Sequence, residues 1–293
     1  MTGVQKARAN GLELAYETFG DPAGRPLLLV MGLATQMLAW HEDWCADLVR
    51  RGFFVVRYDN RDIGLSTHLS DAPPPDLMAA LGGDTSSASY TLDDMADDAA
   101  ALLDALQIPA AHVVGASMGG MIAQMLAVRH PGRVLSLTSI MSTPGPAIGP
   151  ARQEAMAVLL APPVTSRDEA VERGIGTYRV IGSPGYPLDD AWQRGVAGES
   201  YDRAYDPLGV ARQLLAIQAS GDRTEALRGI TAPTLVVHGE DDPLVQVEGG
   251  RATAAAVPGA ELLTIPGMGH NLPRELWPQI LDRVEALTAR AQV

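Results

Sequence analysis

The sequence predicts an α/β fold, in which a mostly parallel central β-sheet is flanked by helices on both faces. Several apolar runs are too short for a helix and suit strands that are buried on both sides of a sheet. Such runs occupy residues 27–31, 53–58, 112–115 and 234–237. They alternate with helical patterns of roughly 10 to 15 residues, and this alternation is typical of right-handed βαβ units.

The remaining elements follow from the same periodicities. Residues 12–19 alternate between apolar and polar and are followed by the breaker Gly20-Asp21-Pro22, which predicts an antiparallel strand at one edge of the sheet. Residues 71–90 are rich in Pro, Gly and Ser, and we expect a mobile loop there. Further strands are expected at 134–142 and 262–265, and helices at 44–51, 92–106, 118–130 and 272–289.

One long segment, residues 144–228, departs from the alternation. It carries helix-like pieces at 152–160 and 210–219, broken by Pro-rich and Gly-rich stretches, and has no strong strand run. Because an unstructured loop of this length is improbable inside a compact domain, we interpret the segment as a helical cap inserted into an α/β core. The predicted organisation is therefore a core at 1–143, a cap at 144–228 and the second part of the core at 229–293.

Composition excludes several classes of partner. The 293 residues include 22 Lys and Arg against 35 Asp and Glu, a formal net charge of −13. Such a chain has no electrostatic attraction to nucleic acid or anionic lipid, so neither partner is expected. The single cysteine, Cys45, excludes an intrachain disulfide and the Cys-rich zinc sites. The opening residues lack the apolar run of a signal peptide, and we expect a cytoplasmic protein with no cofactor and no metal.

The candidate nucleophile lies in Gly115-Ala116-Ser117-Met118-Gly119, which fits the pattern Gly-x-Ser-x-Gly. The motif directly follows a predicted strand and directly precedes a predicted helix, the context that places a serine at the strained tip of a sharp turn. Glycines two residues to either side avoid a collision that a Cβ would cause. The sequence therefore predicts Ser117 as a nucleophile; the alternative is a glycine-rich turn with a capping serine.

The partners of this serine are expected later in the chain, in the order acid and then histidine. His270 lies in a glycine-containing loop just past the predicted strand 262–265. The turn Glu240-Asp241-Asp242-Pro243 follows a buried strand and offers three carboxylates. Asp242 is the favoured acid, Asp241 is the alternative, and Glu240 is expected to face solvent. The predicted triad is thus Ser117, Asp242 and His270.

Two backbone N–H groups are expected to form an oxyanion hole. Met118 supplies the first, because it begins a helix and its N–H has no intrahelical acceptor. Leu33 supplies the second from the loop after the first buried strand, where Gly32 permits the turn. The alternative interpretation of Gly32 is a plain glycine that ends a strand.

The charged segment 57–67 has two interpretations. Asp59 or Arg61 would contact substrate in one; in the favoured one, Asp59, Arg61 and Asp62 bond neighbouring loops and brace the site. His41 and His68 precede the nucleophile in the chain and are candidates for lining a pocket.

Five stretches in this order carry a resemblance to a known family: Leu27-Leu28-Leu29-Val30-Met31-Gly32, the segment 57–67, Gly115-Ala116-Ser117-Met118-Gly119-Gly120, Glu240-Asp241-Asp242-Pro243 and Ile265-Pro266-Gly267-Met268-Gly269-His270. The chain resembles the capped α/β-hydrolases, and most closely the aclacinomycin methylesterase group of bacterial carboxylesterases. The resemblance implies the α/β-hydrolase fold, the triad above, and Leu33 and Met118 as oxyanion donors. Many relatives have His-Gly where this chain has Met31-Gly32.

We therefore expect a carboxylic ester hydrolase that works through an acyl-enzyme on Ser117. Methyl esters of polyketide-like or other small hydrophobic molecules are one expected substrate class, with Gly32, Tyr178 and Trp192 as substrate contacts. Alternatives with the same triad are a C–C bond hydrolase and a cofactor-free perhydrolase. An alternative of another class is a non-catalytic protein that binds small molecules.

Overall fold

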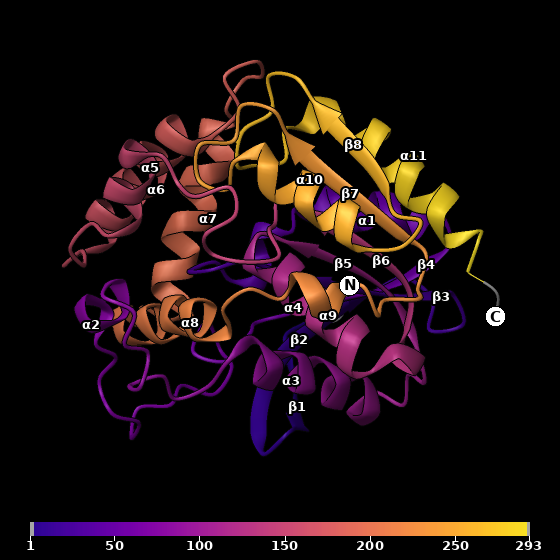
Figure 1. Ribbon diagram of the computed structural model, residues 1–293, viewed down its shortest axis with the longest axis horizontal. Coiled ribbons are helices and arrows are strands. Elements are labelled where there is room, and N and C mark those ends of the chain that lie inside the picture. Colours follow the sequence, from indigo (N-terminus) through magenta and orange to yellow (C-terminus); the bar gives the residue numbers. More distant parts are fainter. Residues whose placement is uncertain (1–2, 292–293) are drawn as a thin grey trace.

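An eight-stranded β-sheet forms the centre of the molecule (Figure 1). The computed structural model describes residues 3–291. The strands are β1 (Gln5–Ala9), β2 (Leu12–Phe19), β3 (Arg25–Val30), β4 (Phe53–Tyr58), β5 (Ala111–Ala116), β6 (Val134–Ile140), β7 (Thr234–Gly239) and β8 (Glu261–Ile265). They lie in the order β1-β2-β4-β3-β5-β6-β7-β8. Strands β3 to β8 run parallel, while β2 is antiparallel to β1 and β4. The predicted α/β class is confirmed.

Helices surround the sheet. They are α1 (Glu42–Arg50), α2 (Leu77–Leu81), α3 (Leu92–Ala105), α4 (Met118–Arg129), α5 (Gln153–Leu159), α6 (Arg167–Ile181), α7 (Asp190–Arg203), α8 (Pro207–Ser220), α9 (Thr224–Leu227), α10 (Val247–Ala256) and α11 (Trp277–Thr288). The predicted helices at 44–51, 92–106 and 118–130 correspond to α1, α3 and α4. Helix α11 begins later than predicted, because Pro273 and a 3₁₀ turn precede it. Helix α10 was not predicted.

The prediction that residues 12–19 form an edge strand was wrong. Strand β1 pairs with β2 and takes the edge position. The two strands are joined by Asn10 and Gly11, whose φ angles of 50° and 77° suit a tight hairpin turn. Strand β1 is mostly polar and exposed, so it lacks the apolar alternation by which β2 was identified. The Asn-Gly pair was the available signal for this hairpin.

Two apolar cores lie on the two faces of the sheet. One contains Leu28 and Val113 with residues of α3 and α4, and the other contains Leu29 and Val114 with residues of α1 and α11. Neighbouring residues on one strand thus enter opposite cores, as the two-residue period of a strand requires. This double burial explains why the parallel strands are apolar throughout.

Residues 144–228 contain helices α5 to α9 and no strand. Figure 1 shows α5, α6, α7 and α8 gathered on one side of the sheet. The short helix α2 lies within the segment 71–90 and packs against α8. Within residues 3–291, no helix has both the length and the apolar character needed to cross a bilayer.

Candidate active site

Ser117 occupies the tip of the sharp turn between β5 and α4. Its φ of 57° lies in the left-handed region, which a non-glycine residue adopts only under constraint. An added Cβ at Gly115 would meet the carbonyl of Gly119, and one at Gly119 would meet the carbonyl of Val30. Close backbone contacts therefore require both glycines, and they hold the serine in its strained conformation.

Ser117, His270 and Asp242 form a continuous hydrogen-bonded chain. Ser117 Oγ lies 2.9 Å from His270 Nε2, and His270 Nδ1 lies 2.7 Å from Asp242 Oδ2. Asp242 and His270 are buried. The three residues follow β5, β7 and β8, and the carboxyl ends of these parallel strands meet at one edge of the sheet. This geometry suits a serine activated by a neighbouring base whose other nitrogen is oriented by a carboxylate.

The turn after β7 separates its three carboxylates. Asp242 Oδ1 accepts hydrogen bonds from the N–H groups of Leu244 and Val245 at 2.8 and 2.9 Å, which leaves Oδ2 for His270. Asp241 instead accepts the N–H of Gly267 at 2.8 Å, and Glu240 accepts the hydroxyl of Thr264. The Asp241 contact holds the loop between β8 and His270, and the Glu240 contact joins the turn to β8 itself.

His238 supports the acid turn, residues 240–243. It is fully buried, and its Nε2–H donates to the carbonyl of Val245 at 2.7 Å. Burial lowers the pKa of His238, so the ring stays neutral at neutral pH. An added Cβ at Gly250 of α10 would collide with this ring. Helix α10 therefore needs a glycine there to pack closely behind the turn that carries Asp242.

The loop that carries His270 is held by residues that the sequence does not indicate. The N–H of His270 donates to the carbonyl of Ile181 at 2.7 Å, and the N–H of Gly269 donates to Ser183 Oγ at 2.9 Å. Ser183 in turn donates to Asn271 Oδ1 at 2.5 Å. The last residue of α6 and the residues that follow it thus fix the position of the imidazole. These contacts join segments distant in the chain, and nothing in the local sequence predicts them.

The two predicted oxyanion donors belong to segments that lie close to the nucleophile. Among the described residues, the N–H groups of Leu33 and Met118 have no hydrogen-bond acceptor. Gly32 is packed against the nucleophile, because an ideal Cβ built on it would lie 3.4 Å from Ser117 Oγ. The peptide that joins Gly32 to Leu33 therefore lies beside Ser117, and Met118 follows Ser117 directly.

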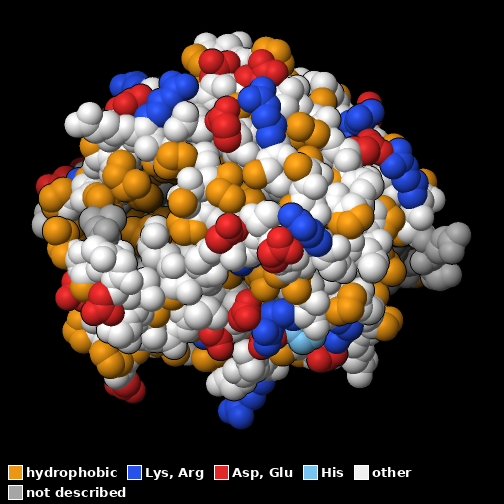
Figure 2. Space-filling view, viewed as in Figure 1, with side chains coloured by type: hydrophobic (Ala, Val, Ile, Leu, Met, Phe, Trp, Pro, Cys, Tyr) orange, Lys and Arg blue, Asp and Glu red, His pale blue; other side chains and the backbone are white. Residues whose placement is uncertain are grey.

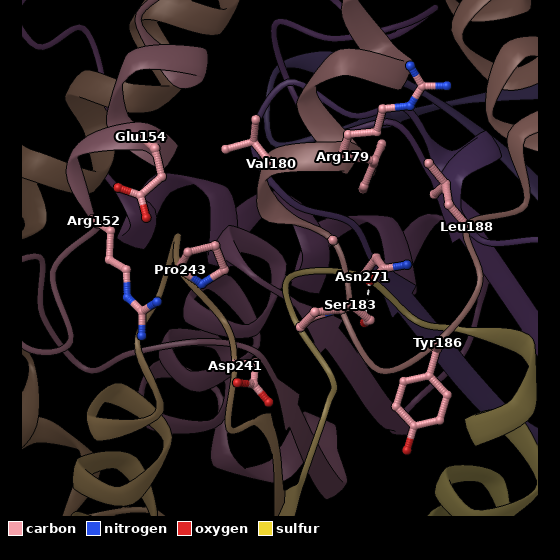
Figure 3. A pocket seen from close by; sticks show the side chains of 13 residues that line it. Arg152, Glu154, Arg179, Val180, Ser183, Tyr186, Leu188, Asp241, Pro243 and Asn271 are labelled. Atoms are coloured by element: carbon pink, nitrogen blue, oxygen red, sulfur yellow. Dashed lines mark hydrogen bonds between the residues drawn. The ribbon is translucent and has the colours of Figure 1, made fainter.

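The predicted substrate contacts Tyr178 and Trp192 occupy different places. Tyr178 lines a cavity of about 300 Å³ between α6 and the acid turn, together with Pro243 and Asn271 (Figure 3). Trp192 is not among the described residues that line this cavity. Its ring lies against His41, with centroids 5.1 Å apart. His41 also accepts the N–H of Asp43 and so caps α1.

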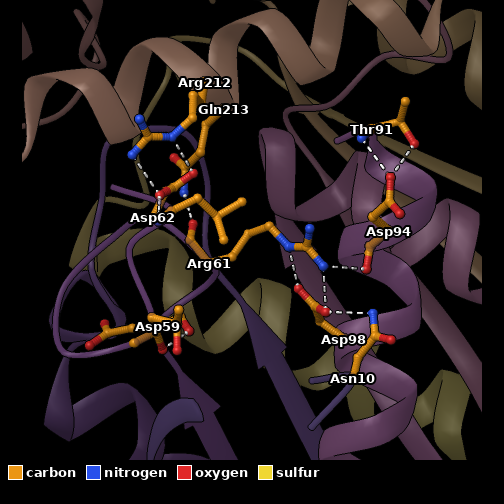
Figure 4. A network of polar contacts seen from close by, with 12 residues as sticks. Asn10, Asp59, Arg61, Asp62, Thr91, Asp94, Asp98, Arg212 and Gln213 are labelled. Carbon is orange, nitrogen blue, oxygen red and sulfur yellow. Dashed lines mark hydrogen bonds and ion pairs between the residues drawn. The ribbon is translucent and has the colours of Figure 1, made fainter. Parts of the chain in front are cut away.

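Charged residues of the segment after β4 form ion pairs with neighbouring elements, as the favoured interpretation predicted (Figure 4). Asp59 accepts a hydrogen bond from Arg203 at 2.9 Å, and Asp62 is bonded by both Nε and Nη2 of Arg212 at 2.9 and 2.8 Å. Arg61 binds Asp98 of α3 through two hydrogen bonds of 2.6 Å. These acceptors and donors are buried or nearly so. Two of the three braces reach helices of the segment 144–228, a connection that the sequence did not indicate.

His68 belongs to the same network. Burial alone would lower its pKa, but hydrogen bonds to the carbonyl of Gly64 and to Asp206 outweigh burial and raise the pKa above its usual value. Asp62, His68 and Asp206 are also grouped as metal ligands could be. One carboxylate oxygen or ring nitrogen from each lies within 4.8 Å of those of the other two. Arg212 bonds both carboxylates, at 2.8 and 3.4 Å, and supplies the positive charge that this cluster requires.

The surface near the helices of segment 144–228 is partly apolar. Figure 2 shows a hollow on the left of the view, bordered by hydrophobic side chains. Among the side chains that the structure describes, most exposed large hydrophobic residues lie on α2 or in that segment. They are Met78, Leu160, Val180, Tyr205 and Leu208.

Comparison with known proteins agrees with this architecture. The chain matches the family described as alpha/beta hydrolase fold over residues 25–273. It is 31% identical to the rhodomycin D methylesterase DauP of Streptomyces sp. (strain C5), over 94% of this chain and 95% of that protein. It is 26% identical to the bifunctional esterase/perhydrolase DCH of Acinetobacter calcoaceticus, over 90% of this chain and 91% of that protein.

A solved structure shares the whole fold. The enol-lactonase from Burkholderia xenovorans LB400 superimposes with a TM-score of 0.72, covering 98% of this chain and 100% of that one, at 24% identity. At this identity the match concerns the fold.

Proposed function

The chain belongs to the alpha/beta hydrolase fold family, and from this premise we propose that it hydrolyses carboxylic esters through an acyl-enzyme on Ser117. The observation that carries the proposal is the hydrogen-bonded chain from Ser117 Oγ through His270 to Asp242. A serine at a strained turn beside two free backbone N–H groups completes the requirements for acyl transfer.

Each residue has a distinct role in the proposed reaction. Ser117 Oγ attacks the ester carbonyl while His270 Nε2 takes its proton, and the oxyanion accepts hydrogen bonds from Leu33 and Met118 N–H. His270 then gives the proton to the leaving alcohol. Asp242 keeps the imidazole in the correct tautomer and stabilises its charged form. Water activated by His270 attacks the acyl-enzyme and releases the carboxylic acid.

Small hydrophobic esters, methyl esters among them, are the proposed substrates. The name of the methylesterase relative supports this class. We further propose that residues 144–228 act as a cap on a core of 1–143 and 229–293, with Gly32, Tyr178 and Trp192 toward substrate. We propose that the protein is located in the cytoplasm. The buried free thiol of Cys45 is compatible with this reducing compartment.

The Ser117→Ala variant tests the proposed function. We expect it to keep the fold, measured by circular dichroism, and to lose at least about 10³-fold in kcat on short-chain aryl esters, because no other group replaces the nucleophile. Unimpaired hydrolysis by this variant contradicts the proposal. A wild-type protein that binds esters without cleaving them would instead support a non-catalytic binding role.

Perhydrolysis is a second candidate, since DCH is named an esterase and perhydrolase. In that reaction hydrogen peroxide replaces water as the attacker of the same acyl-enzyme and releases a peracid. A peracid assay on wild-type protein with hydrogen peroxide and a carboxylic acid distinguishes the two activities. Cleavage of a C–C bond remains an alternative of the same triad, and a diketone substrate tests it.

A further inference from the structure

Two side chains outside the triad hold the turn that carries Leu33. They are Thr35, in the turn itself, and Gln213, on α8. We propose that Thr35 and Gln213 are positioning residues that aim the Leu33 N–H at the oxyanion. The inference rests on the proposed function, because it concerns the oxyanion hole of the same reaction.

Thr35 fixes the peptide that bears the donor. The carbonyl of Gly32 accepts a hydrogen bond from Thr35 Oγ1 at 2.9 Å and a longer one from Thr35 N at 3.4 Å. In a planar trans peptide the C=O and the N–H point in opposite directions. Holding the carbonyl of Gly32 therefore sets the direction of the Leu33 N–H on the other side of the same peptide.

Gln213 fixes the next peptide. Residues 32–35 form a four-residue turn in which Ala34, at the third position, has a φ of 61°. A positive φ at this position is typical of a type II turn and normally requires glycine, whereas a type I turn has a negative φ there. Gln213 Oε1 accepts the N–H of Ala34 at 3.2 Å. This hydrogen bond holds the middle peptide in the orientation that alanine alone disfavours.

Gln213 is itself rigidly placed. It is fully buried, and its Nε2 donates to the carbonyl of Arg61 at 2.8 Å. The adjacent Arg212 pairs with Asp62, so α8 is tied to the segment after β4 (Figure 4). The loop is also held through Gln36, whose Nε2 donates to the carbonyl of Ser200 at 2.7 Å. The geometry of the oxyanion hole therefore depends on how the helices of segment 144–228 sit on the sheet.

Three threonine variants test the first contact. In Thr35→Val the shape is kept and the hydroxyl lost; we expect kcat on an aryl ester to fall by about 10- to 100-fold, less than full removal of an oxyanion donor, with KM within about twofold. Thr35→Ser restores the hydroxyl and should keep kcat within about threefold. Thr234→Val is the matched control: the Thr234 hydroxyl also donates to a nearby carbonyl, that of Ala232 at 2.9 Å, and Thr234 begins β7, at the end of the strand away from the triad. It should leave kcat unchanged.

A rescue experiment tests the second contact. Gln213→Leu should lower kcat by about 10-fold or more, because alanine then favours a negative φ and the middle peptide turns over. Adding Ala34→Gly should recover most of this loss, since glycine adopts a positive φ without strain. A merely structural role for Gln213 predicts lower thermal stability and no such recovery in kcat.

The outcomes separate this inference from the proposed function. If wild-type protein hydrolyses esters, Ser117→Ala does not, and both Thr35→Val and Gln213→Leu match wild type in kcat, the inference is wrong and the esterase proposal stands. If wild-type protein does not hydrolyse esters, the proposed function fails first. The positioning roles predict that, across the variants, a boronic acid inhibitor loses affinity in proportion to the loss in kcat.

Discussion

Two buried histidines, His112 and His238, have surroundings that disfavour the protonated ring. Burial, followed by the charge of Arg25, lowers the pKa of His112 to about 4. Its Nδ1 lies 2.9 Å from Ser136 Oγ, and its ring is nearly perpendicular to that of Phe53, with centroids 6.0 Å apart. Because the pKa is lower in the folded state, the unfolded chain binds the proton first as the pH falls. The stability due to neutral His112 is complete above about pH 6.5 and is lost toward pH 4.

This residue-scale effect predicts the outcome of a titration. Between pH 6.5 and 4 the free energy of unfolding should fall by roughly 3 kcal/mol because of His112, on top of the contribution of His238. His112→Asn cannot titrate, so its free energy of unfolding should change less over the same window. Urea unfolding at several pH values measures both slopes, and equal slopes for the two proteins would contradict the assignment.

At the scale of elements, α8 is joined to the sheet by a buried ion pair. Arg212 and Asp62 are both almost fully buried. An added Cβ at Gly209 would meet the carbonyl of Asp62, so the glycine lets α8 approach the chain after β4. Removing one member of such a pair leaves an uncompensated buried charge.

Arg212→Met should therefore lower the free energy of unfolding by about 3 to 5 kcal/mol. Arg194→Met is the matched control, because Arg194 pairs with Glu172 at 2.6 Å on an exposed face of the same segment. Exposed pairs contribute little, so this variant should change stability by less than about 1 kcal/mol. Chemical denaturation checks both, and equal effects would show that the Arg212 pair does not anchor α8.

The elements that the sequence failed to predict have physical explanations. Strand β1 is polar because it lies at the edge, and its hairpin is marked only by Asn10-Gly11. Helix α10 carries Gly249 and Gly250, which are poor helix formers. Added Cβ atoms there would meet Thr143 and His238. Close packing against the acid turn thus requires glycines in α10, and these glycines weaken the helical pattern in the sequence.

For the molecule as a whole, the order of motifs in the sequence predicted the fold and the triad, but it did not predict the side-chain contacts that support them. Parallel strands buried on both faces are continuous apolar runs, so the sheet and the placement of Ser117, Asp242 and His270 at strand ends followed from the sequence. Thr35, Gln213 and Ser183 did not. Gln213 and Ser183 contact partners that are distant in the sequence, and Thr35 acts through a turn whose orientation only the packed helices determine.

Ser117 is the residue proposed to form the covalent acyl intermediate. Peptide mass spectrometry after treatment with a fluorophosphonate tests it most directly, because the reagent labels an activated serine. We predict one adduct on wild-type protein, on the peptide that contains Ser117, and none on Ser117→Ala. An adduct on another residue, or an unlabelled wild-type protein that is folded, would contradict the proposed role of Ser117.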